Sequence, residues 1–164
     1  MNCVMRVGSL VALGIAVACA VQSGCSTKVC TLIGCGPPFE ITFAASGGQW
    51  LSGTYSVAVT ADSTAGSCVV TLPFASCQTA PSCMGTRDWD VIDSGCALTP
   101  DKHSISGIVF SATTPMNIEV VVSRDGRQLA DDTFTPSYQS SQPNGPGCGD
   151  TCYGAPAASL ALQP

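Results

Sequence analysis

Cysteines are the residues of this chain whose positions most clearly predict chemistry. The 164 residues include eleven cysteines, and a thiol can be acylated, oxidised to a disulfide or used as a metal ligand. Cys25 lies shortly after an apolar segment, whereas eight further cysteines lie beyond it, several of them in closely spaced pairs. We therefore expect attachment chemistry at Cys25 and cross-linking by the remaining eight, which are Cys30, Cys35, Cys68, Cys77, Cys83, Cys96, Cys148 and Cys152.

The first 24 residues have the organisation of an export signal. Residues 1–6 carry one positive charge, residues 7–21 are apolar or small, and Gln22, Ser23 and Gly24 are polar or small. This order is typical of a secretory signal peptide. A transmembrane anchor is the alternative, but the apolar run of 15 residues is shorter than the roughly 20 that a spanning helix needs. We expect a signal peptide over residues 1–24.

Ser23-Gly24-Cys25 resembles the end of a bacterial lipoprotein signal, where a small pair precedes the cysteine that is lipidated and becomes the first residue. Gln22 departs from the apolar residue that this pattern prefers, and Cys19 offers a second cleavage point. Lipidation of Cys25 leaves an even number of cysteines, whereas cleavage at Cys19 leaves one thiol unpaired. We therefore expect Cys25 to carry palmitate-type acyl chains and to anchor the protein in the cell envelope, in the outer membrane.

Composition limits the class of protein that follows the signal. Removal of residues 1–24 leaves 140 residues, with five basic residues against eleven acidic ones, so a nucleic-acid partner is not expected. Only 10% of the residues are charged, and the chain contains 17 glycines and 11 prolines, a composition that suits an extracellular β domain with many turns. We expect a tether over residues 25–38 and one domain over residues 39–164.

Alternation of apolar and polar residues predicts an all-β fold. The clearest segment is residues 54–62, in which Tyr55, Val57 and Val59 share one face, and it is expected to form a hairpin with residues 67–72. No long segment has helical periodicity. The other expected strands cover residues 39–43, 89–92, 105–112, 116–123, 129–135 and 159–162.

Asp125-Gly126 is the strongest turn signal, because this pair suits a type I′ hairpin. A plain two-residue loop would pair Val122 with Leu129, but it would also set Asp132 opposite Glu119, and like charges directly opposite are unfavourable. A bulge near Ala130 would instead bring Phe134 beside Ile118. Since neither register is free of an inward or clashing acid, residues 129–135 are expected at a sheet edge.

An exported chain with eight cysteines is expected to hold up to four disulfides. A strand that continues beyond Cys68 leaves too few residues to return to Cys77, so Cys68 is expected to pair with Cys83 or Cys96. We favour Cys68–Cys96 with three local pairs, namely Cys77–Cys83, Cys30–Cys35 and Cys148–Cys152. Two of the short spacings could also hold zinc, but oxidation is the simpler fate of thiols outside the cytoplasm.

Other residue types predict no catalytic site, metal or cofactor. His103, the only histidine, lies between Asp101 and Ser104, but this segment is read as a turn, since a triad is defined by geometry in the fold. The acids at 88, 90, 131 and 132 lack calcium-loop spacing. The aromatic residues Trp50, Trp89, Tyr138 and Tyr153 could form a carbohydrate platform or pack against disulfides.

Two resemblances extend this reading. Gly53-x-Tyr55-x-Val57-x-Val59 is similar to a strand of immunoglobulin-like, fibronectin-like and PKD-like domains, which implies an immunoglobulin-like antiparallel β-sandwich with disulfide-stapled loops. The segments at 30–35, 53–60 and 142–148 resemble cysteine-rich predicted lipoproteins of the myxobacterial kind, which implies export and lipidation but no activity or site.

The expected function is a lipid-anchored, non-enzymatic envelope protein acting as a structural or interaction module. A glycan- or metal-binding module is the alternative. The partner beyond the membrane would be a protein or a glycan.

Overall fold

The computed structural model describes residues 29–77, 80–85 and 88–163. The predicted signal peptide over residues 1–24 and the predicted lipidation at Cys25 lie outside these residues. Within the described ranges, no helix has the length and apolar character needed to cross a membrane.

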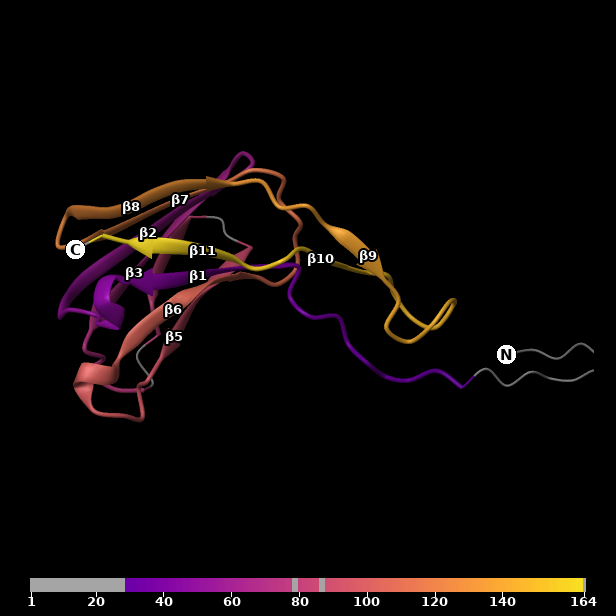
Figure 1. Cartoon of the computed structure of the whole chain (residues 1–164), viewed down its shortest axis with the longest axis horizontal. Coiled ribbons are helices and arrows are strands. Elements are labelled where there is room, and N and C mark those ends of the chain that lie inside the picture. The colour runs from indigo at the N-terminus through magenta and orange to yellow at the C-terminus, as the bar shows by residue number, and fades with distance from the viewer. Residues whose placement is uncertain (1–28, 78–79, 86–87, 164) are drawn as a thin grey trace, which may run out of the picture.

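The chain folds mainly into β-strands, as expected, and most of them belong to two sheets (Figure 1). The larger sheet has the order β4 (Ser82–Gly85), β3 (Thr64–Leu72), β2 (Gly53–Ala61), β7 (Ile118–Arg124) and β8 (Arg127–Phe134). The smaller sheet has the order β11 (Ala158–Leu162), β1 (Phe39–Ala45), β6 (Ser104–Phe110) and β5 (Trp89–Ser94). The short 3-10 helices η1 (Ser46–Gly48) and η2 (Pro100–Lys102) are single turns.

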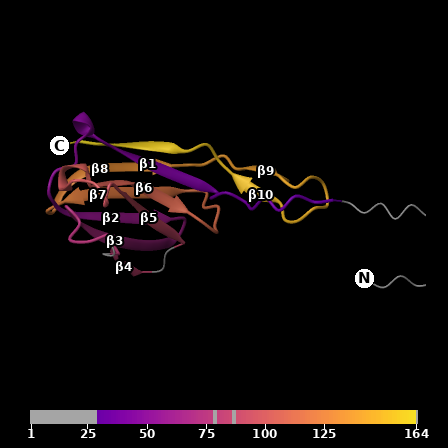
Figure 2. The same cartoon turned by 90° about the horizontal axis from the view of Figure 1, so that it is seen from below.

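The inward faces of the two sheets form one hydrophobic core, as the two layers in Figures 1 and 2 indicate. In β2, Tyr55, Val57 and Val59 are at most 1% exposed while the residues between them are partly exposed. This period of two is the reason that the segment folds as a half-buried strand. The expected hairpin of β2 with β3 is confirmed, and β2 also pairs with β7.

One strand pair differs from the expectation of an antiparallel fold. β11 pairs in parallel with β1, with Phe43 opposite Leu160, whereas the other pairs are antiparallel. Alternation within residues 159–162 predicts a strand but contains no information about its direction or partner. The pairing with β1 makes this strand the edge of the smaller sheet. Its residues Leu160 and Leu162 are buried in the core.

The turn between β7 and β8 decides between the two registers that the sequence leaves open, and the bulged one is observed. Asp125 and Gly126 have φ values of 50° and 81°, the left-handed conformations that a type I′ turn requires. Val122 then pairs with Ala130 rather than with Leu129, and Phe134 lies opposite Ile118. β8 is at the edge of its sheet, as expected.

All eight candidate cysteines form disulfides, but the pairing that we favoured is wrong. Cys68 is bonded to Cys83, its direct partner on the adjacent strands β3 and β4, and Cys77 is bonded to Cys96. The exclusion of a Cys68–Cys77 bond is confirmed, and Cys83 is one of the two partners expected for Cys68. The sequence shows no alternation that would have indicated β4 and favoured Cys83 over Cys96. The three local pairs are also wrong, because Cys77 and Cys83 have these other partners and the remaining bonds are Cys30–Cys148 and Cys35–Cys152.

These last two disulfides create a projection that we call the stalk, made of residues 29–37 and 139–154. Residues 139–154 contain a small hairpin of β9 (Gln139–Ser141) and β10 (Cys152–Gly154). The Asn144 side chain accepts a hydrogen bond from the Ile33 amide and donates one to the Ile33 carbonyl, both at 2.8 Å. The described part of the expected tether is therefore not closed by a loop of its own; it is bonded to the hairpin that projects from one end of the sheets (Figures 1 and 2).

Candidate functional site

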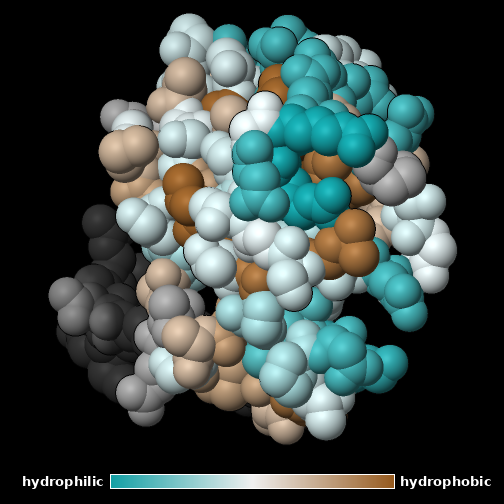
Figure 3. All heavy atoms as spheres, turned by 90° about the vertical axis from the view of Figure 1, so that its left-hand side faces the viewer, coloured by the Kyte–Doolittle hydropathy of each residue, from teal (hydrophilic) through white to brown (hydrophobic). Residues whose placement is uncertain are grey.

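A cavity opens at the end of the sheets opposite the stalk, which we call the distal end (Figure 3). The cavity has a volume of about 120 Å³. In the view of this end, hydrophilic side chains surround a hydrophobic patch. Both sheets and the segment that connects β1 to β2 contribute to the lining, which consists of Ala45, Ser46, Gln49, Trp50, Leu51, Tyr55, Arg124, Leu129, Leu162 and Gln163.

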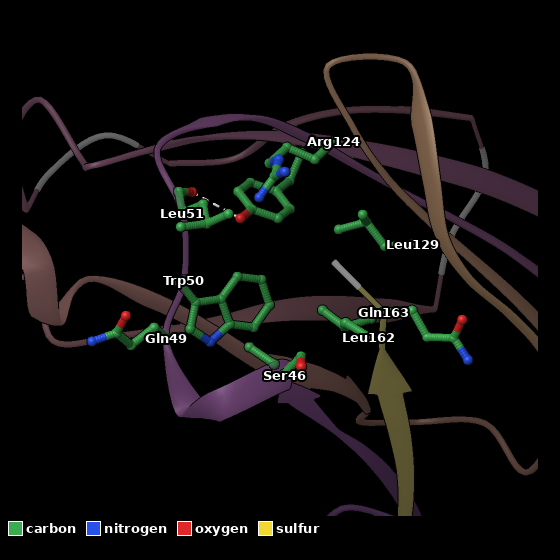
Figure 4. Close-up of a pocket in the computed structure, with 10 residues that line it drawn as sticks. Ser46, Gln49, Trp50, Leu51, Arg124, Leu129, Leu162 and Gln163 are labelled. Carbon is green, nitrogen blue, oxygen red and sulfur yellow. Dashed lines mark hydrogen bonds between the residues drawn. The ribbon is translucent and has the colours of Figure 1, made fainter.

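The floor of the cavity is apolar and continuous with the core. Tyr55, Leu129 and Leu162 are 1%, 6% and 5% exposed. The Tyr55 hydroxyl donates a hydrogen bond to the Leu51 carbonyl at 2.8 Å, so this polar atom of the floor already has a partner. The Trp50 ring lies 5.2 Å from the Tyr55 ring, centre to centre, and forms a wall (Figure 4).

The edges of the two sheets meet beside this floor. The Gln163 amide, directly after β11, donates a hydrogen bond to the Leu129 carbonyl of β8 at 2.9 Å. Leu129 is the extra residue of the bulge, since its neighbours Gln128 and Ala130 pair with Ser123 and Val122. The bulge therefore leaves a β8 carbonyl available to the other sheet, and this hydrogen bond joins the two sheets beside the cavity.

Arg124 is the charged residue of the lining. The alternation that buries Ile118, Val120 and Val122 continues to Arg124, which lies directly opposite Tyr55 in the pairing of β7 with β2. An arginine therefore occupies the last core-facing position of β7. Its side chain is half-buried, and it forms no ion pair within the described residues. The lining contains no acidic residue. The lining residues therefore carry a summed formal charge of +1, in a chain whose formal net charge is −5.

The position of Arg124 is fixed by contacts between the turn and the start of β2. The Asp125 amide donates to the Thr54 carbonyl at 2.8 Å, and the Thr54 amide donates to Asp125 Oδ1 at 2.9 Å. Gly53 has a φ of 150°, and a Cβ atom added there would lie 3.0 Å from Cγ of Arg124 and 2.5 Å from Oδ2 of Asp125. A glycine at position 53 thus leaves space for the Arg124 stem against the backbone of β2.

His103 has a structural environment. Its ring is 6% exposed and stacks on Phe74 at 5.0 Å. Nδ1 accepts a hydrogen bond from the Phe74 amide at 2.9 Å, and Nε2 lies 3.3 Å from the Leu98 carbonyl. Because Nδ1 is an acceptor, the neutral tautomer with a proton on Nε2 satisfies both contacts. The neighbouring Asp101 pairs with Lys102 at 3.3 Å.

The structure does not bring the candidate aromatic residues together. Trp50 lies at the distal cavity, whereas Trp89 is 2% exposed in the core. Tyr138 packs edge-on against Phe39, and Tyr153 is exposed on the stalk hairpin. Only Trp50 is therefore placed to contact a ligand in this cavity.

The candidate acidic residues are also separated by the fold. Asp88 and Asp90 lie at the start of β5, in the smaller sheet, whereas Asp131 and Asp132 belong to β8 in the larger one. Among the residues that the structure describes, no three His, Cys, Asp or Glu side chains are grouped as metal ligands would be. The cysteines considered for zinc are disulfide-bonded.

Sequence reasoning missed Arg124 as a site residue, although a signal was present. Extending the alternation of residues 118–122 by one step places this arginine on the core face, where a charged side chain is rare. Gln49 and Gln163 carry no comparable signal, because they come from irregular segments that only the fold brings together.

Comparison with known proteins identifies no relative: no protein family, curated protein or solved structure matches this chain.

Proposed function

We propose that this protein is a lipid-anchored component of the cell envelope that acts as an interaction module and binds its partner at the distal end. The observation that supports this most strongly is the placement of the stalk and the cavity at opposite ends of the sheets. The described chain begins at Val29 in the stalk, four residues after the proposed lipidated Cys25. An anchor at Cys25 would hold the stalk at the membrane and leave the distal end facing away from it.

The disulfides support both an oxidising location and a defined spacing from the membrane. Four disulfides in one small domain are typical of proteins outside the cytoplasm. The two stalk bonds join segments that are 118 and 117 residues apart in sequence, so the residues nearest the proposed anchor are linked covalently to the far part of the chain. A single acyl chain binds a membrane only marginally, so we propose that Cys25 carries more than one.

The strand order supports an immunoglobulin-like sandwich as the fold. In such domains strands A-B-E-D form one sheet, and C′ and C″ extend the sheet of C, F and G. The order β11-β1-β6-β5 matches A-B-E-D, and β4-β3-β2-β7-β8 matches C″-C′-C-F-G. Two departures are the parallel β11 in the position of strand A and the lack of a disulfide between the strands that match B and F. Sandwiches of this class present binding loops at their ends, which agrees with a distal binding site.

A glycan partner is the second candidate, because Trp50 and two glutamines lie at the same cavity. An aromatic face packs on the apolar face of a sugar ring, and the amides of Gln49 and Gln163 are able to hydrogen-bond hydroxyl groups. A glycan array tests this candidate. Reproducible binding that is lost in Trp50→Ala and kept in Tyr153→Ala would support it.

The anchor is tested by fractionation and by intact-mass measurement of membrane-extracted protein. The expected mass is that of residues 25–164 with acyl chains added and eight hydrogens removed by four disulfides. Cys25→Ser should release a folded protein from the membrane, whereas the matched control Cys19→Ser should leave it bound. Membrane retention of the Cys25→Ser variant, or a soluble mature form starting elsewhere, would refute the anchor.

A further inference from the structure

We propose that the distal cavity binds an apolar group about the size of one ring that carries a carboxylate. This inference rests on the proposed function in taking the distal end as the binding end, and it specifies the chemistry that is recognised there. Three properties of the cavity lead to it, namely its size, its floor and its single charge.

The volume sets the size of the group. The cavity measures about 120 Å³, and a cavity of roughly 150 Å³ in a protein core is large enough to hold benzene. The part of a ligand that enters the cavity is therefore about the size of one ring or one branched aliphatic side chain, and the rest of the ligand would extend out of its open side.

The floor selects an apolar group. Tyr55, Leu129 and Leu162 present carbon atoms, and the Tyr55 hydroxyl already donates to the Leu51 carbonyl. A sugar hydroxyl pressed into this floor would lose its hydrogen bonds to water without replacement, which costs free energy. An aliphatic or aromatic group gains from the same burial, so the floor favours hydrocarbon over a polyhydroxylated ring.

Arg124 selects the carboxylate. Its guanidinium belongs to the last core-facing position of β7 and has no ionic partner among the described residues. The nearest acid in sequence, Asp125, lies in the turn, where its Oδ1 accepts the Thr54 amide. The planar guanidinium matches a carboxylate through two parallel hydrogen bonds. A ligand with hydrocarbon in the cavity and a carboxylate at the rim would satisfy both ends of the site.

Two sources offer this chemistry, the C-terminal residue of a polypeptide and a free small acid. Acetyl-Gly-Gly-Leu represents the first source and benzoate the second, and the corresponding amides remove the charge while keeping the shape. Glucuronate serves as the control acid whose ring is polyhydroxylated and not apolar. Binding is measured on the full-length Cys25→Ser chain from the shift of the Trp50 indole N–H signal in nuclear magnetic resonance, with the Trp89 signal as internal reference.

We expect at least one of the two acids to bind about tenfold more tightly than its amide, or better, because a charge-assisted pair is lost in the amide. Arg124→Gln should reduce the preference for acid over amide to less than about threefold. Arg127→Gln, which removes the same charge three residues away in the same hairpin, should keep it. Arg124→Met, which retains the stem that packs on Gly53, replaces Arg124→Gln if that variant does not fold.

Each outcome decides between the alternatives. Preference confined to the tripeptide supports a polypeptide end as the ligand, and preference confined to benzoate supports a small acid. No binding at millimolar concentration, equal binding of acid and amide, or a preference that persists without Arg124 would overturn the proposal. Glucuronate binding as tightly as the better acid would also overturn it, in favour of a glycan. Release of Cys25→Ser from the membrane is scored separately, so a failed anchor and a failed ligand are distinguishable.

Discussion

Removal of the two stalk disulfides should destabilise the protein more than the sum of the separate removals. Cys30–Cys148 and Cys35–Cys152 close loops of 118 and 117 residues, and the two loops overlap over residues 35–148. When one bond is present, the other closes only a ring of about ten residues, because most of the chain is already constrained. Either bond alone therefore removes most of the entropy that the two bonds together remove from the unfolded chain, and adding the second bond removes less than the first.

Loop-closure entropy gives the expected sizes. The first bond across about 118 residues contributes about 5 kcal/mol to the free energy of unfolding, and the second, across the small ring, contributes about 2.7 kcal/mol. Replacing either pair by alanine should therefore cost about 2.7 kcal/mol, and replacing both should cost about 7.5 kcal/mol. The excess over additivity is about 2 kcal/mol.

The assay is urea unfolding without reductant, in which tryptophan fluorescence reports the fraction of unfolded protein. All variants are measured in the same concentration of a stabilising osmolyte, so that the four-alanine variant remains folded. Replacement of Cys77 and Cys96, which close a loop of 19 residues, is the control; it should cost about 3 kcal/mol and add to either single stalk removal.

The same set of variants distinguishes the two overlapping long-range bonds from the local pairing expected from sequence. Bonds within residues 30–35 and within 148–152 would each contribute about 2 kcal/mol and would be additive, for a total of about 4 kcal/mol. An additive result near that total would refute the reasoning from overlapping loops.

Two further predictions concern individual side chains. Burial, together with the charge of Asp62, raises the pKa of Tyr138 from 10.0 to about 12, and its hydroxyl donates to the Pro115 carbonyl at 3.1 Å. The folded state keeps this proton while the unfolded state loses it, so the stabilising contribution is complete below pH 10 and is lost as the pH rises through 12. Rapid-mixing urea unfolding over this range should show a smaller loss of stability in Tyr138→Phe than in the exposed control Tyr153→Phe; equal losses would contradict the assignment. His103→Phe keeps the stacking on Phe74 but leaves the Phe74 amide without its acceptor, so the free energy of unfolding should fall by about 1–2 kcal/mol. An unchanged urea midpoint would show that this hydrogen bond contributes little.

Local patterns in the sequence predicted much of the fold. Alternation located β2, β3 and β7, and the inward or clashing acids in both possible registers of the last hairpin correctly placed β8 at a sheet edge. These features depend on residues that are close in sequence, so they can be predicted from local sequence patterns. Lipidation of Cys25 and the envelope location stay predictions.

The disulfide pairing and the site depended on contacts between distant segments. Cys83 pairs with Cys68 because β4 extends the larger sheet, and β4 is too short and irregular to show alternation. The cavity forms because Trp50, Arg124 and Gln163, which come from three separate segments, meet at one end of the sheets. The cavity is therefore determined by the tertiary structure and not by any local sequence pattern.

The parallel pairing of β11 with β1 has a consequence for the order of folding. β11, which covers the outer edge of β1, follows the other described strands in the sequence, whereas β1 precedes them. Until residues 158–162 arrive, β1 presents an unpaired backbone edge, which is a site for pairing with other chains. The smaller sheet is therefore completed only when residues 158–162 are present, and a chain truncated before residue 158 would expose this edge to aggregation.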